Sequence, residues 1–256
     1  MLIVKRKLSL SYFIIIVYNN EIMITNYKYK DSLTWDRNLF WGIIFIGFAL
    51  GMLVFSGLLT IFMRIIVNGN GNQLILFLTI GSLGIFVISM IQWFMSSKRS
   101  YAWSSIRLFL SIIFWAMLFS GLFHLLLVKD VASFSPSSLF LIMLAPILIM
   151  AIAAVLSFFD ISMHKLSIVM SLLLVAFIIM AIISIFAYRA YFWVLLIQGA
   201  IFTINSLFAF RQIRQAEMFA NNKLVLNAIF WTTELLNNYF HLLYVVVRLL
   251  LIRSRD

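Results

Sequence analysis

Residues 39–95 read LFWGIIFIGFALGMLVFSGLLTIFMRIIVNGNGNQLILFLTIGSLGIFVISMIQWFM, which is two long apolar runs joined by the repeat NGNGN. A helix needs about 20 residues to cross the roughly 30 Å hydrocarbon core of a bilayer, and each run is longer than that. Asparagine and glycine favour a tight turn between the runs. The stretch therefore predicts two transmembrane helices joined by a short connection.

The composition of the whole chain agrees with this interpretation. Hydrophobic residues make up 64% of the 256 and charged residues only 11%, whereas about a quarter of the residues of a soluble domain are charged. Ten Gly and two Pro are too few for a strand-and-turn protein, and the long apolar runs differ from the short alternating strands of a barrel. The composition thus predicts an all-α integral membrane protein.

Further apolar runs extend this pattern to seven spans and a membrane domain over residues 39–256, with Arg211–Lys223 as its most polar link. The tail, residues 1–38, contains an apolar segment at Leu8–Val17 that is too short to span. This tail is interfacial or disordered, or translation starts at Met23; both interpretations remain open. The predicted spans are Leu39–Val67, Gln73–Met95, Ser105–Val128, Leu139–Phe159, Ser167–Ala187, Tyr191–Phe210 and Leu224–Val247.

The basic residues predict an orientation, because Lys and Arg accumulate on the cytoplasmic side. The amino-terminal side collects thirteen of the 19 and the opposite side six, which are Arg64, Lys129, Arg189, Arg248, Arg253 and Arg255. We therefore expect a cytoplasmic amino terminus and an external carboxyl terminus, in a bacterial plasma membrane. This arrangement also accounts for the net charge of +11 without a nucleic-acid partner; the expected partner is the lipid bilayer, and protein partners are not identified.

One acidic residue, Glu234, falls within an apolar span. An ionised carboxylate there costs on the order of 2.5–3.5 kcal/mol by insertion scales, so such residues are protonated, paired or exposed to water. Polar residues recur on the same face of the last span, seven residues apart or close to Glu234: Asn227, Asn237, Asn238, His241 and Arg248. The sixth span carries Gln198, Asn205 and Gln212 at the same spacing, so we expect the two stripes to face each other or a water-filled cavity.

Arg211 closes the sixth span on the inner side and has two interpretations. It is either an ordinary cytoplasmic flank or a cation that extends toward Glu234 and pairs with it. In the first span, Gly47 and Gly51 form a GxxxG spacing that permits close approach of another helix.

Catalytic motifs do not emerge from the sequence. The three histidines, His124, His164 and His241, lack the spacing of a zinc site, and there is no cysteine, Walker motif or dinucleotide fingerprint. We expect no enzymatic activity, no cofactor and no resident metal.

The carboxyl-terminal span carries a family resemblance. Residues 231–237, WTTELLN, resemble the last-helix motif Leu-Tyr-Leu-Asp-x-x-Asn of the transmembrane Bax inhibitor motif family, with Glu234 in place of the Asp and Asn237 in place of the Asn. The resemblance implies a seven-helix bundle with the last helix at its centre. It also implies a pH-sensitive leak of calcium ions or protons.

The chain departs from the family at the sixth span. The family pairs two aspartates on the last two helices as a proton-sensing latch, yet Ala209–Arg211, where the second should fall, contains no acid. If Arg211 takes that place, an opposite charge favours the ionised form of Glu234, and the latch responds less to mild acid.

Three functions remain open from the sequence. The first is a calcium or proton leak gated around Glu234. The second is a non-conducting regulator or scaffold acting through protein partners, and the third is a small secondary transporter, although no internal repeat or broken helix pair supports it.

Overall fold

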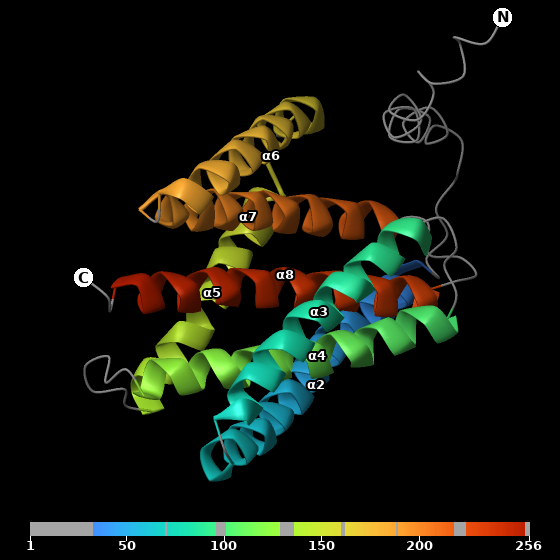
Figure 1. The fold of residues 1–256 in the computed structure, drawn as a ribbon. Helices are drawn as coiled ribbons and strands as arrows, with labels where there is room; N and C mark the ends of the chain where they lie inside the picture. Colours follow the sequence, from blue (N-terminus) through green and yellow to red (C-terminus); the bar gives the residue numbers. More distant parts are fainter. Residues whose placement is uncertain are drawn as a thin grey trace, which may run out of the picture. The chain divides into compact units, whose positions relative to one another are not determined.

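The computed structural model of this chain describes residues 33–69, 71–95, 101–128, 136–159, 162–187, 189–217 and 224–253. Within these ranges there is no strand, and nearly every residue is helical, which confirms the all-α class. The helices, labelled as in Figure 1, are α2 (Leu33–Asn68), α3 (Asn72–Met95), α4 (Tyr101–Val128), α5 (Pro136–Leu156), α6 (Met163–Phe186), α7 (Ala190–Glu217) and α8 (Leu224–Arg253).

From Arg37 onward the chain forms one compact unit. Most of the tail predicted for residues 1–38 lies outside the described residues, although α2 begins at Leu33, six residues before the predicted span. Each predicted span corresponds to one helix. The helices are longer than most of the spans because polar residues continue the helical backbone beyond the apolar stretch.

The surface of the helices suits lipid. Six of the helices are long and apolar enough to cross a membrane, and α5 contributes a shorter apolar segment, Phe140–Leu156. Large apolar side chains are exposed along them, for example Leu53 at 69% and Phe186 at 86%. Monomeric soluble proteins rarely expose apolar patches of that extent, so these surfaces fit a multi-pass membrane protein.

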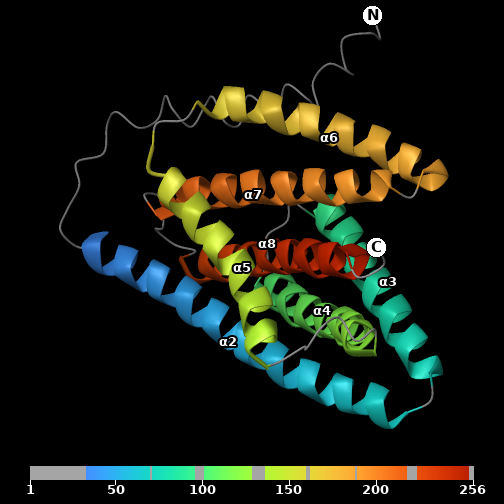
Figure 2. The ribbon, with the colours of Figure 1, turned by 90° about the vertical axis from the view of Figure 1, so that its left-hand side faces the viewer.

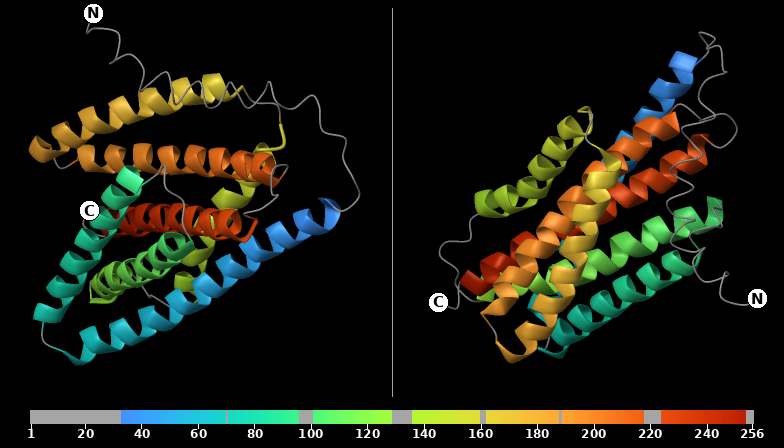
Figure 3. Two further views of the ribbon diagram at one scale, coloured as in Figure 1. Left: turned by 90° about the vertical axis from the view of Figure 1, so that its right-hand side faces the viewer. Right: turned by 90° about the horizontal axis from the view of Figure 1, so that it is seen from above.

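Helix α8 packs against α4, α5 and α7, while α3 packs on α4 and α6 packs on α7 (Figures 2 and 3). Aromatic side chains fill the contact between α2, α4 and α8: the Phe55 ring lies 4.7 Å from that of Phe240 and 5.8 Å from that of Phe119. All three side chains are fully buried. This packing holds α8 in place and fixes which of its faces meets each neighbour.

The glycines of α2 lie where the sequence predicts close helix packing. A Cβ atom on Gly47 would stand 2.9 Å from Thr232 of α8, and one on Gly51 would stand 2.5 Å from Leu236. A methyl group at either position would have to displace a side chain of α8, so α8 is the helix that packs against these two glycines.

One predicted connection is wrong in part. The sequence predicts a link over Arg211–Lys223, yet α7 continues through Glu217. Arg211 and Arg214 therefore project from a helix, which fixes their direction relative to α5 and α8. The remaining residues of the link lie outside the described ranges.

Candidate functional site: a polar cavity beside α8

An ion pair joins α4 to α8. A terminal guanidinium nitrogen (Nη1) of Arg107 donates to Oε1 of Glu234 at 2.7 Å. The Arg107 side chain is only 7% exposed and that of Glu234 is 24% exposed. Both charges lie well inside their helices, since Arg107 is the seventh residue of α4 and Glu234 the eleventh of α8. The structure thus gives the intramembrane carboxylate a buried cationic partner.

The pair faces a cavity of about 190 Å³ between α3, α4, α7 and α8. Its lining is rich in hydroxyl and amide groups, with apolar and aromatic side chains among them. The lining residues are Ile85, Ile88, Ser89, Gln92, Arg107, Ser111, Trp115, Phe202, Asn205, Glu234, Asn237, Asn238 and His241. This volume is sufficient for several water molecules.

Amide side chains tie α7 to α8 within the cavity. Nδ2 of Asn205 donates to Oδ1 of Asn238 at 2.8 Å. Two further donors, Nε of Arg107 and Nδ2 of Asn238, are buried without a hydrogen-bond partner among the described residues. Because buried donors generally find a partner, these two favour water inside the cavity.

Aromatic rings close the cavity at the level of His241. The imidazole stacks on Phe202, with 3.9 Å between ring centroids and 7° between planes, and meets the edge of Trp115 at 4.8 Å. Further along α8, Nε of Arg248 donates to the Tyr244 hydroxyl at 3.1 Å, and the Arg248 guanidinium lies 5.6 Å from the Tyr191 ring. The polar face of α8 therefore has two parts, separated by the rings around His241.

The predicted site residues fall into two groups. Five of them line the cavity: Asn205, Glu234, Asn237, Asn238 and His241. Gln198, Asn227 and Arg211 are partly buried and are not among the described residues that line it. The cation that lies against Glu234 is Arg107, and a contact of Arg211 with Glu234 stays a prediction.

Arg107 is one of the thirteen basic residues that the sequence assigns to the amino-terminal side, and nothing in that assignment pairs it with Glu234. The available signal was the spacing of Arg107, Ser111 and Trp115 at four-residue intervals, which places all three on one face of α4. On α3, Ser89 and Gln92 are three residues apart and share a face in the same way. Small polar residues are common in membrane helices, so the few polar residues of α3 and α4 did not by themselves indicate a polar cavity.

The donor set limits what the cavity can bind. Among the described residues, no three His, Asp or Glu side chains gather in a group that could hold a metal ion. The single carboxylate of the cavity is already in contact with a guanidinium. A lining of hydroxyls, amides and one ion pair can form hydrogen bonds to water, and it favours water and protons as the contents of the cavity.

No protein-family model, curated protein or solved structure matches this chain.

Proposed function

We propose that this chain is a seven-span membrane protein that leaks protons through the polar cavity, with the Arg107–Glu234 ion pair as the gate. The observation that carries the proposal is that pair, which is buried between two membrane helices and exposed to a cavity large enough for water. The 21 residues of α5 are long enough to make the seventh span. The amino terminus faces the cytoplasm of a bacterial plasma membrane.

A proton suits the cavity better than calcium. Calcium takes six to eight oxygen ligands, with carboxylates usually among them. Here one carboxylate is available, and the guanidinium at 2.7 Å opposes a second cation. A proton needs only Glu234 and a chain of water and hydroxyl groups, and Ser89 and Ser111 line the cavity.

Gating follows from two features in series. While ionised Glu234 pairs with Arg107, both side chains are held; protonation of the carboxylate removes the attraction and frees them to move. The stacked rings of Phe202 and His241 form a second barrier. In this structure the ion pair is formed and the rings are stacked, so its conformation is the closed state of the pathway.

The resemblance to the transmembrane Bax inhibitor motif family becomes part of this proposal. The packing of α8 among α4, α5 and α7 and the shared cavity of Glu234 and Asn237 support it. The latch would then differ from the family's, because the partner of the carboxylate is an arginine on α4 and not a second acid on α7.

The test is proton flux into proteoliposomes that contain the purified protein, measured with an entrapped pH dye across a series of external pH values. We expect wild-type flux to rise on acidification and the neutral double variant Arg107→Gln/Glu234→Gln to lose this pH dependence. Arg189→Gln, an exposed cation outside the cavity, is the control and should behave as wild type. Unchanged pH dependence in the double variant would refute the gate.

A single variant gives the sign of the effect. Arg107→Gln removes the partner that holds the Glu234 side chain at 2.7 Å, so flux should rise above that of wild type. Phe202→Ala should raise flux at every pH by removing one stacked ring. If the wild-type protein carries neither protons nor calcium under any condition, the non-conducting regulator becomes the better interpretation.

A further inference from the structure

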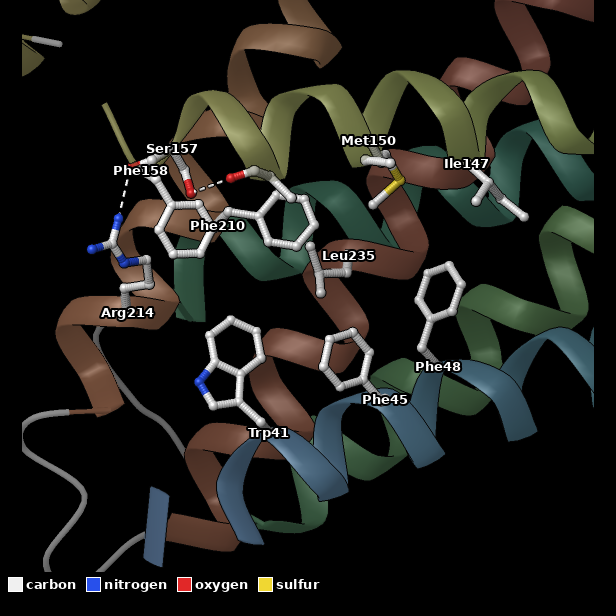
Figure 4. A pocket seen from close by; sticks show the side chains of 12 residues that line it. Trp41, Phe45, Phe48, Ile147, Met150, Ser157, Phe158, Phe210, Arg214 and Leu235 are labelled. Atoms are coloured by element: carbon white, nitrogen blue, oxygen red, sulfur yellow. Dashed lines mark hydrogen bonds between the residues drawn. The ribbon is translucent and has the colours of Figure 1, made fainter. Parts of the chain in front are cut away.

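A second cavity lies between α2, α5, α7 and α8 and has almost entirely apolar walls (Figure 4). Its volume is about 560 Å³, within the range of ligand-binding cavities. Trp41, Phe45 and Phe48 of α2 form one wall, and Ile147 and Met150 of α5 face them. Such walls exclude a polar solute, because they offer it no hydrogen bonds.

One end of this apolar cavity carries a positive charge. The Arg214 guanidinium donates to the carbonyl oxygen of Ser157 at 2.8 Å and lies 4.4 Å from the Phe158 ring centroid. Figure 4 shows these three residues at the end of the cavity away from Ile147 and Phe48. A guanidinium has five N–H donors, so the bond to Ser157 leaves others that can bind an anion.

The charged end of the cavity lies near the end of a membrane span. Arg214 lies three residues before the end of α7, and Trp41 is near the amino-terminal end of the first membrane span. From Ser157 the apolar wall continues along α5 to Ile147, ten residues or about 15 Å along the axis of that helix. The guanidinium therefore lies where it can meet a charged headgroup, and the apolar wall leads away from it.

We propose that this cavity binds an anionic phospholipid of the cytoplasmic leaflet, with its phosphate on Arg214 and one acyl chain between α2 and α5. Charge complementarity selects this occupant: phosphate is a preferred ligand of guanidinium, and the cytoplasmic leaflet is rich in anionic lipid. The choice of leaflet rests on the orientation given under Proposed function, but the site does not depend on the proton leak, because the two cavities share no lining residue.

The test is native mass spectrometry of the full-length protein released from micelles that contain equal amounts of phosphatidylglycerol and phosphatidylcholine. Wild type should retain one phosphatidylglycerol with about five-fold preference, the effect of one basic side chain on an anionic lipid. Arg214→Gln should lose that preference. Lys165→Gln removes an exposed cation from α6 and should keep it.

A second pair of variants tests the apolar part. Ala151→Phe places a ring in the cavity from an exposed position and should reduce retention of both lipids, whereas Ala49→Phe adds the same ring to an exposed position outside the cavity and should not. Equal retention of the two lipids by wild type, or equal loss of preference in Lys165→Gln, would overturn the site. Retention of a free fatty acid in place of phospholipid would also overturn the proposed occupant.

Discussion

Two cavities meet α8 at consecutive residues, Glu234 and Leu235, and they differ in almost every physical respect. The cavity at Glu234 is about 190 Å³, is lined by hydroxyls and amides and contains a paired charge of each sign. The cavity at Leu235 is about 560 Å³ and is apolar except at its Arg214 end. Successive residues of a helix point about 100° apart, so one helix serves both.

The difference teaches how polar groups are distributed in a protein surrounded by lipid. In the polar cavity each charge depends on its partner, because neither water nor lipid replaces it fully. In the apolar cavity the single guanidinium lies at a helix end, where it can reach the membrane interface. Substitutions should therefore have large effects on the first cavity and small effects on the second.

The largest expected effect comes from leaving Arg107 without its partner. Glu234→Leu should lower the free energy of unfolding by about 3 kcal/mol, the usual result of removing one member of a buried ion pair. Arg214→Leu, in the apolar cavity, should lower it by less than about 1 kcal/mol. Both are measured by SDS-induced unfolding in the same mixed micelles.

The double variant Arg107→Leu/Glu234→Leu tests whether the unpaired charge of Arg107 causes the loss of stability in Glu234→Leu. Because it removes both charges, it should recover at least half of the stability lost by Glu234→Leu. Purely additive losses would show that packing, not charge pairing, distinguishes the polar cavity.

Some features of this structure can be predicted from the sequence and others cannot. The helices follow from long apolar runs. The facing of Asn205 and Asn238 follows because Asn205 belongs to a seven-residue polar series and Asn238 lies four residues after Glu234, on the polar face of the neighbouring helix. The role of Arg107 did not follow, because it is 127 positions from Glu234 and the packing of α4 on α8 is a tertiary property. The apolar cavity could not be predicted for a similar reason. Phe45 and Met150 resemble lipid-facing residues in the sequence, and only the packing of α2 and α5 in the structure brings them to one cavity.

An intermediate effect tests the rigidity of the polar cavity's walls. A Cβ atom on Gly81 of α3 would stand 2.7 Å from the backbone nitrogen of Leu118 on α4, and backbone cannot move aside. Gly81→Ala should therefore lower the free energy of unfolding by about 2 kcal/mol. The control is Gly42→Ala on α2, a helix that lines the apolar cavity; its Cβ would meet nothing within 4 Å. That variant should gain up to about 1 kcal/mol from helix propensity, and a loss equal to that of Gly81→Ala would show that the contact with Leu118 is not the cause of the loss at Gly81.

The smallest effect concerns the hydrogen bond between Asn205 and Asn238. Hydrogen bonds between membrane helices average about 0.6 kcal/mol in double-mutant cycles, since the separated helices find other partners. Asn205→Leu, Asn238→Leu and the double variant should give a coupling energy of that size, measured by the same unfolding assay. Gln198→Leu lies seven residues before Asn205 on α7 and outside the polar cavity, so its coupling with Asn238→Leu should be zero within error. A coupling of zero for the Asn205 pair would mean that water already satisfies both amides, and the packing of α7 on α8 would then rest on other contacts, such as the stacking of Phe202 on His241.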